Sequence, residues 1–413
     1  MTSELFFSFM TSLLICMALI PPLRMLADRF HFMDQPGERK VHQHPIPRIG
    51  GIAFAIGACV SIAWWAPKDI TTLSVLLGGL IILGFGVWDD RVNLGYRIKL
   101  LGQVLAALAV ILIGGIRFES IPFLLDAELP LWVSIPVTML FLAAVSNAVN
   151  LTDGLDGLAG GLSFLTLCGI AYLAHLSNDS LVLLLAVPLM GGLLGFLRYN
   201  TYPARIFMGD GGSQLLGFMM GVLAILLTDS ARGPFSSSLS LFLLGLPFLD
   251  TLGVSAQRLA EGHSPFIGDR RHIHHKLLTA GLSHYEAVTA IYAFQAGMVG
   301  LAYLLRWQSD TLIVPLYLTL ACAVLALFIA SAHGLIPNPA PRNARAWPDR
   351  WLSDVLSGPW LRDLPIRFLA VVVPLFLIAT VFLPAEVPHD IGYLSTGLFV
   401  IVLLGLAFIP RLA

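Results

Sequence analysis

The sequence has few charged residues. Asp, Glu, Lys and Arg make up 12% of its 413 residues, against about 25% in ordinary globular chains, whereas apolar residues make up 57%. Apolar runs near 20 residues recur along the chain, and about this length crosses a hydrocarbon core about 30 Å thick. A soluble domain is therefore excluded. We predict an all-α, polytopic transmembrane helical bundle whose partners include membrane lipids and no nucleic acid.

Cysteine is scarce, and the first apolar run lacks the pattern expected of a secretory signal. The four cysteines fall inside apolar runs without a CxxC pair, so we expect neither disulfides nor metal sites from them. The first apolar run, 5–20, follows Glu4 instead of a basic segment and leads into Pro21 and Pro22 instead of a cleavage site. We therefore expect an uncleaved first span.

The apolar runs predict thirteen spans. We expect the first eleven spans in one transmembrane domain over 1–335, then a linker and a C-terminal hairpin over 336–413. The predicted spans lie near 4–20, 49–66, 70–88, 98–116, 131–149, 157–175, 180–197, 213–228, 238–257, 286–305, 311–332, 366–383 and 391–409.

The positions of Lys and Arg predict the orientation. With the N-terminus outside, 20 of the 24 Lys and Arg residues fall on the inner side, and the other four are Lys68, Arg117, Arg232 and Arg306. Lys and Arg accumulate in cytoplasmic loops. We therefore expect the N-terminus outside the cytoplasm and the loops that carry most of the Lys and Arg residues on the cytoplasmic side.

Unusual polar motifs fall on this same inner face. They are DDR at 89–91, NAVNLTDGLDG at 147–157, RIFMGDGGS at 205–213, Asp250 in the ninth span, and HIHHK at 272–276. Acids beside apolar spans are costly and usually have a partner or a function. The glycines around Asp210 precede a predicted helix, whose N-terminal N–H groups suit phosphate, although the Gly-Lys-Ser/Thr ending of a Walker loop is absent.

The acids together could hold a hard cation. Mg²⁺, with Mn²⁺ as a substitute, suits them because it needs only one or two carboxylates and completes its shell with waters and phosphates. For any single pair of these acids, the alternative is that both carboxylates are hydrated at the end of a span and bind no metal. The Lys and Arg side chains on this face could bind phosphates. The tendency of Lys and Arg to lie in cytoplasmic loops would also explain why they are here. The histidines suit hydrogen bonding to substrate, with zinc as the alternative.

Together, these motifs make residues 1 to about 335 resemble the polyprenyl-phosphate N-acetylhexosamine-1-phosphate transferases. The resemblance implies a UDP-N-acetylhexosamine donor, undecaprenyl phosphate as acceptor, release of UMP and dependence on Mg²⁺. It also implies that 1–335 is a catalytic domain of about eleven core spans, to which the C-terminal hairpin is extra. The expected location is a bacterial inner membrane, with a periplasmic N-terminus and the active site in the cytoplasm. By motif, Asp210 resembles the metal ligand. The implied catalytic residues are Asp89, Asp90, Asp153 and Asp156. The implied substrate-binding residues are Asn150, Arg97 or Lys99, Arg205, Asp250, His272, His274 and His275.

The HIHHK loop looks like the branch that transfers N-acetylglucosamine-1-phosphate and starts O-antigen, common-antigen and teichoic-acid chains. Phospho-MurNAc-pentapeptide transferases, which usually carry consecutive histidines and an acid there, are the alternative within the family. A secondary transporter is the alternative outside it, but transporters hold their ionisable groups near the midplane. A non-catalytic lipid-phosphate scaffold would not need so many acids. Both a monomer and a homodimer remain open.

Overall fold

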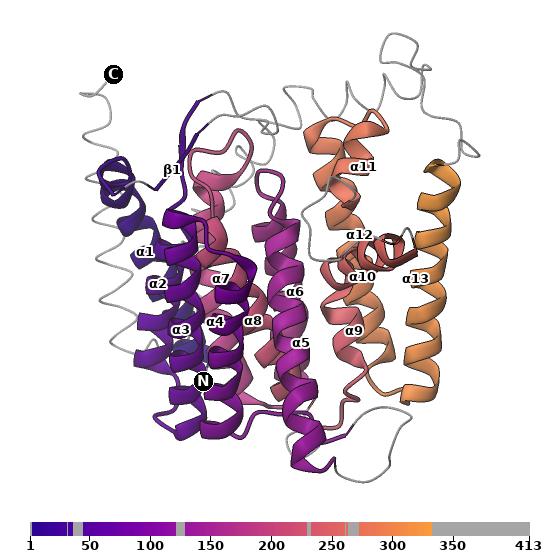
Figure 1. Cartoon of the computed structure of the whole chain (residues 1–413). Coiled ribbons are helices and arrows are strands. Elements are labelled where there is room, and N and C mark those ends of the chain that lie inside the picture. The colour runs from indigo at the N-terminus through magenta and orange to yellow at the C-terminus, as the bar shows by residue number, and fades with distance from the viewer. Residues whose placement is uncertain are drawn as a thin grey trace, which may run out of the picture. The chain divides into compact units, whose positions relative to one another are not determined.

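The computed structural model describes residues 2–30, 32–35, 44–120, 129–228, 233–260, 262 and 272–332. These residues form a bundle of helices, which confirms the all-α membrane class (Figure 1). Eight of the described helices are long and apolar enough to cross a membrane. The chain divides into two units, 1–339 and 340–413. The predicted spans near 366–383 and 391–409 lie outside the described residues.

The described helices follow the first eleven predicted spans, with ends that differ by a few residues. The helices are α1 (Thr2–Leu26), α2 (Gly50–Trp65), α3 (Ile70–Val92), α4 (Tyr96–Leu108), the π-helical turn η1 (Ala109–Ile113), α5 (Leu131–Thr152), α6 (Leu158–Leu176), α7 (Ser180–Asn200), α8 (Gly209–Leu227), α9 (Leu239–Leu243), α10 (Gly245–Ala260), α11 (Ile273–Thr279), α12 (His284–Leu305) and α13 (Asp310–Ala332). Two short strands, β1 (Met33–Asp34) and β2 (Ile46–Pro47), pair antiparallel.

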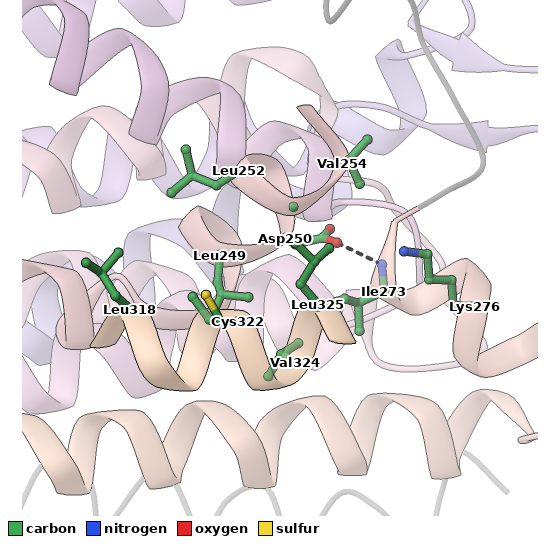
Figure 2. A pocket seen from close by; sticks show the side chains of 12 residues that line it. Leu249, Asp250, Leu252, Val254, Ile273, Lys276, Leu318, Cys322, Val324 and Leu325 are labelled. Carbon is green, nitrogen blue, oxygen red and sulfur yellow. Dashed lines mark hydrogen bonds between the residues drawn. The ribbon is translucent and has the colours of Figure 1, made fainter. Parts of the chain in front are cut away.

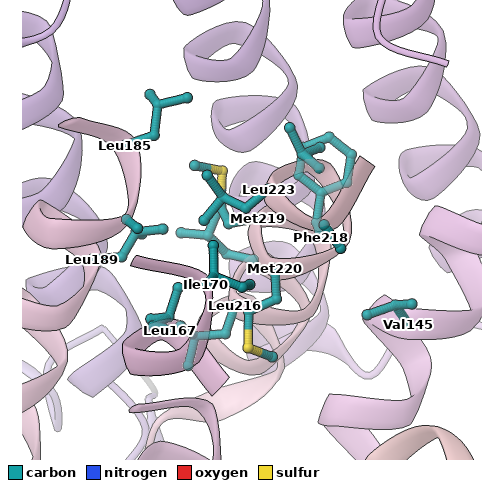
Figure 3. Packing of buried hydrophobic residues seen from close by; sticks show 14 of the residues in the cluster. Val145, Leu167, Ile170, Leu185, Leu189, Leu216, Phe218, Met219, Met220 and Leu223 are labelled. Carbon is teal, nitrogen blue, oxygen red and sulfur yellow. The ribbon is translucent and has the colours of Figure 1, made fainter. Parts of the chain in front are cut away.

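Helix α8 lies at the centre of the bundle. Every residue of α8 except Asp210 is buried, because α2, α3, α5 and α6 pack around it. Figure 3 shows its leucine, methionine and phenylalanine side chains against those of α6 and α7. Two close approaches need glycine. A Cβ on Gly86 would lie 2.4 Å from the Cα of Gly211, and one on Gly217 would lie 2.6 Å from the Cα of Ser146. Small residues of this kind let membrane helices approach closely.

The predicted span 238–257 is two helices. The chain breaks between α9 and α10 at Gly245, whose φ is +34°. Gln295 of α12 is fully buried and satisfies the backbone at the break. Its Oε1 accepts the N–H of Leu246 at 2.9 Å, and its Nε2 donates to the carbonyl of Leu243 at 3.0 Å. A broken helix is tolerated at membrane depth only where protein satisfies its backbone groups in this way.

Candidate active site

Four carboxylates from three parts of the chain meet at the end of the bundle near β1 and α11 in Figure 1. We refer to Asp89, Asp90, Asp153 and Asp210 as the acid cluster. Asp89 and Asp90 lie in the last turn of α3, Asp153 follows the last residue of α5, and Asp210 lies in the first turn of α8. The sequence motifs that contain these acids are therefore joined in space.

Lys99 ties two members of the acid cluster together. Its ammonium pairs with the Asp89 carboxylate and lies 2.9 Å from Oδ2 of Asp210. Asp89 is buried, and its other oxygen accepts the N–H of Leu94 at 2.6 Å. Arg97 is exposed, with its Nε 3.2 Å from the hydroxyl of Tyr96. Of the two cations between which the sequence does not choose, Lys99 is the one that contacts the acid cluster.

Asp90 caps helix α8. Its two carboxylate oxygens accept the backbone N–H groups of Asp210, at 2.8 Å, and Gly211, at 3.0 Å. Gly209 has a φ of +74°, and a Cβ there would lie 2.6 Å from the Asp90 carboxylate. The glycines therefore let Asp90 reach the start of the helix. The two N–H groups that we expected to face phosphate are taken by Asp90 instead.

Asp153 is a half-buried carboxylate with a raised pKa. Burial is the largest cause that brings the pKa of Asp153 to about 7. The negative charges of Asp210, Asp90 and Asp156 add to this effect. No described residue donates a hydrogen bond to its side chain. A carboxylate that is surrounded by acids and lacks a donor among the described residues is suited to a bound cation.

The described residues contain no group of three or more His, Cys, Asp or Glu side chains arranged to hold a metal ion by themselves. Mg²⁺ does not need such a group, because one or two carboxylates suffice when waters and substrate phosphates supply the other ligands. Asp210 and Asp153 therefore fit the divalent cation that the sequence predicts.

Residues 150–157 comprise the last residues of α5 and the loop that follows it, and we refer to them as the 150–157 loop. Hydrogen bonds to neighbouring segments fix this loop. Asn150 donates to the hydroxyl of Ser213 at 3.1 Å, and Oδ2 of Asp156 accepts the N–H of Ala204 at 2.9 Å. Asn200, which the sequence motifs do not include, joins this loop to the next one. It accepts the N–H of Gly157 at 2.9 Å and donates to the carbonyl of Ile206 at 2.9 Å.

Arg205 is exposed, and its backbone N–H donates to the carbonyl of Tyr199 at 2.8 Å. Within the described part of the chain, the Arg205 side chain forms no hydrogen bond or ion pair with the acid cluster. Its predicted role in substrate binding stays a prediction.

Three amides form a polar layer one turn deeper than Lys99 and Asp210. Gln103 of α4 and Asn147 of α5 exchange hydrogen bonds at 3.0 and 2.9 Å, and Gln103 lies 3.4 Å from Gln214 of α8. Our motifs missed both glutamines. Each lies four residues after a site residue, Lys99 or Asp210, and this spacing places it on the same face of the helix. That spacing is the signal that could have found them.

Asp250 fixes the start of the histidine helix. Its carboxylate lies 2.9 Å from Nδ1 of His272 and accepts the N–H of Ile273 at 2.9 Å. Asp250 also borders a pocket of about 160 Å³ between α10, α11 and α13 (Figure 2). Apart from Asp250 and Lys276, the side chains that line the pocket are apolar. The contacts of Asp250 are those of a residue that positions His272.

His274 and His275 continue this cluster. The ring of His274 is buried, and a Cβ on Gly154 would lie 2.3 Å from its Nε2, so His274 packs directly on the 150–157 loop. Burial, with a smaller effect from the neighbouring His275, lowers the pKa of His274 to about 3. The rings of His274 and His275 lie 4.2 Å apart. The structure therefore brings the histidine motif to the loop that carries Asp153 and Asp156.

Comparison with known proteins places the chain among membrane transferases. Residues 72–228, which hold the three aspartate motifs, match glycosyl transferase family 4. A probable undecaprenyl-phosphate N-acetylglucosaminyl 1-phosphate transferase of Bacillus subtilis (strain 168) is 34% identical over 331 residues, 80% of this chain and 92% of that protein.

Two further relatives come from other bacterial groups. A decaprenyl-phosphate N-acetylglucosaminephosphotransferase of Mycolicibacterium smegmatis is 35% identical over 65% of this chain and 74% of that protein. An undecaprenyl-phosphate alpha-N-acetylglucosaminyl 1-phosphate transferase of Escherichia coli (strain K12) is 27% identical over 74% of this chain and 84% of that protein. The chain belongs to glycosyl transferase family 4 and is a multi-pass membrane transferase.

Proposed function

We propose that the protein transfers N-acetylglucosamine-1-phosphate from UDP-N-acetylglucosamine to undecaprenyl phosphate and releases UMP. The relatives from Bacillus subtilis and Escherichia coli are named for this acceptor and this sugar. The observation that carries the proposal is the convergence of Asp89 and Asp210 on Lys99, beside Asp153, at one end of the bundle. Such a site offers both carboxylates for a metal and a cation for phosphate.

We place this site on the cytoplasmic face of a bacterial inner membrane, because 20 of the 24 Lys and Arg residues fall on that side. The product would then start a cell-envelope polysaccharide such as an O-antigen or common-antigen chain. Reagent access tests this orientation. A cysteine introduced in the exposed 93–95 turn of a cysteine-free variant should be labelled by an impermeant maleimide only after the cells are opened.

Mg²⁺, with Mn²⁺ as a substitute, is the proposed cofactor. Asp210 and Asp153 would hold it, because Asp90 is occupied in capping α8 and both oxygens of Asp89 are engaged, one by Lys99 and the other by the N–H of Leu94. Lys99 contacts Asp210 through Oδ2. Bound there, the ion would neutralise charge on the diphosphate and polarise the phosphorus that is attacked.

The proposed reaction is a single displacement. An oxygen of the lipid phosphate bonds to the β-phosphorus of the donor, and the bond from that phosphorus to the bridging oxygen breaks, so that UMP leaves. Phosphate has a second pKa near 6, and the nucleophile needs little help from a base. Both oxygens of Asp89 are engaged, by Lys99 and by the N–H of Leu94. These contacts support the role of Asp89 as a residue that positions Lys99. They argue against a covalent phospho-aspartate intermediate at Asp89.

Purified protein in detergent, supplied with undecaprenyl phosphate, Mg²⁺ and one radiolabelled donor at a time, tests the proposal. We expect transfer from UDP-N-acetylglucosamine or a close N-acetylhexosamine analogue, and none from UDP-MurNAc-pentapeptide. Efficient transfer from the pentapeptide donor would assign the protein to peptidoglycan synthesis. Uptake of a solute into vesicles, without transfer from any donor, would support a transporter instead.

A further inference from the structure

Arg48 lies beside the active site, although none of the site motifs contains it. The segment that carries it runs along the loop before Asp210. The carbonyl of Pro47 accepts the N–H of Phe207 at 2.8 Å, and the N–H groups of Gly50 and Gly51 donate to the carbonyls of Phe207 and Met208 at 2.9 and 2.8 Å. Three backbone hydrogen bonds therefore fix the position of Arg48 relative to the first turn of α8.

The close packing of α2 on α8 strengthens this connection. A Cβ on Gly51 would lie 2.5 Å from the Cα of Gly212, so the starts of the two helices are in backbone contact. Arg48 lies three residues before this contact, and Asp210 lies two residues before it. Arg48 and Asp210 therefore both lie within three residues of the contact between Gly51 and Gly212.

A buried acid orients the Arg48 side chain. Asp34 of β1 forms an ion pair with the guanidinium, and the N–H of Arg48 donates to the carbonyl of Phe32 at 2.8 Å. The side chain of Asp34 is 9% exposed and that of Arg48 is 28% exposed. A guanidinium has five N–H donors, and a carboxylate can engage two of them in a bidentate pair. Donors therefore remain for a second acidic group.

The charge balance of the site calls for such a cation. The acid cluster has four carboxylates, and the ammonium of Lys99 pairs with two of them. A nucleotide diphosphate and a lipid phosphate would bring further negative charge. Arg48 supplies a guanidinium from the segment that is hydrogen-bonded to residues 207 and 208, directly before the start of α8.

We propose that Arg48 binds a phosphate group of a substrate and that Asp34 positions it for this role. The identity of the phosphate rests on the proposed function, and it belongs either to the donor diphosphate or to the acceptor lipid. The competing explanation is that Arg48 only secures the β1–β2 hairpin through Asp34.

Three variants separate these explanations: Arg48→Met, Asp34→Asn and, as a matched control, Arg24→Met at the exposed end of α1. For each, UDP-N-acetylglucosamine binding is measured by calorimetry with Mg²⁺ and without acceptor. The KM for undecaprenyl phosphate and the melting temperature are measured alongside. Arg48→Met should raise either the donor Kd or the acceptor KM at least about tenfold, the usual effect of losing a charged hydrogen bond.

The quantity that rises identifies the phosphate. Asp34→Asn should have a clearly smaller effect on it, because the guanidinium is kept, and Arg24→Met should have none. If Arg48→Met fails to insert, Arg48→Lys, which keeps the charge but loses the planar fork, should still weaken binding about threefold.

The inference is overturned if the wild type transfers sugar phosphate and Arg48→Met, or Arg48→Lys in its place, matches its Kd and KM. It is also overturned if Arg48→Met and Asp34→Asn weaken binding equally and lower the melting temperature equally, since the role is then structural. A wild type that binds no donor and transfers nothing contradicts the proposed function, and this inference falls with it.

Discussion

Asp90 and Asp210 are carboxylates of the same cluster, but their contacts give them different roles. Asp90 accepts two backbone N–H groups and is committed to the start of α8. Asp210 contacts the ammonium of Lys99 instead of a backbone N–H. Two aspartates that lie close together in the structure thus serve as a helix cap and as a candidate metal ligand. Only their contacts distinguish these roles.

Substituting Asp210 tests its role as a metal ligand. We expect Asp210→Asn to abolish turnover and Mg²⁺-dependent binding of UDP-sugar, because a neutral amide is a much weaker ligand for a hard cation. Asp179→Asn is the matched control. Asp179 caps α7 by accepting the N–H of Val182 at 3.0 Å, and asparagine caps helices as well as aspartate does. Transfer near the wild-type rate by Asp210→Asn at saturating Mg²⁺ would refute the assignment.

The lowered pKa of His274 predicts how stability depends on pH. The unfolded chain binds a proton to this histidine below about pH 6.5, whereas the folded protein does so only near pH 3. The unfolded state therefore gains protons as the pH falls through this window, and the free energy of unfolding decreases. This one histidine should make the free energy of unfolding about 2 kcal/mol lower at pH 5 than at pH 7.

Thermal unfolding of the wild type and of His274→Gln, measured from pH 5 to pH 7.5, checks this prediction. The variant should lose part of the acid destabilisation, and its melting temperature should vary less over this range. His175→Gln, at the end of α6, is a histidine control outside the site. Identical pH profiles for the wild type and His274→Gln would show that His274 is not held neutral by burial.

At the scale of elements, the sequence predicts where helices lie but not where they break. The lengths of the apolar runs predict the first eleven spans, and a helix or a broken helix lies at each of these places. Eight of the described helices are long and apolar enough to cross a membrane. The break between α9 and α10 depends on Gln295, which lies about 50 residues later in the chain. A local pattern cannot contain a hydrogen bond to a distant residue. For this reason, the sequence pattern predicts a single helix over 238–257.

Gln295→Ala tests whether this side chain maintains the break. The substitution leaves the N–H of Leu246 without its buried acceptor, at a cost of about 1–3 kcal/mol. The carbonyl of Leu243 loses one of its two donors and keeps the hydroxyl of Thr166 at 3.2 Å. We therefore expect a lower melting temperature. We also expect reduced transfer, because α10 carries Asp250, which positions His272. The exposed Gln308→Ala is the control. A Gln295→Ala protein as stable as this control would contradict our explanation.

At the scale of the whole molecule, the sequence supplies the site residues but not their contacts. Asp89, Asp153 and Asp210 were each predicted from a motif beside a span. Their location at one end of the bundle is predicted only from the accumulation of Lys and Arg in cytoplasmic loops. Arg48, Asn200 and the amides below Lys99 could not be identified in this way, because their roles depend on packing between segments far apart in the chain.

The C-terminal part of the chain differs in character from the catalytic part. Residues 368–383 and 391–409 contain no Asp, Glu, His, Lys or Arg. The relative from Bacillus subtilis is matched over 92% of its length by 80% of this chain, so about a fifth of this chain lies outside that alignment. All the site residues of the described structure lie before residue 333.

Truncation after Leu335 tests whether the C-terminal hairpin that the sequence predicts takes part in catalysis. An even number of added spans leaves every earlier motif on its predicted side of the membrane, and the hairpin carries no group able to do the chemistry. We expect the specific activity of correctly inserted truncated protein to stay within a few-fold of the full chain, because Lys99, the acid cluster and the histidine motif are all retained. Specific activity is measured per mole of folded protein after size-exclusion chromatography, since expression can fall independently. A truncated protein that is monodisperse and binds Mg²⁺ and UDP-sugar, yet cannot transfer, would make the hairpin part of the active enzyme.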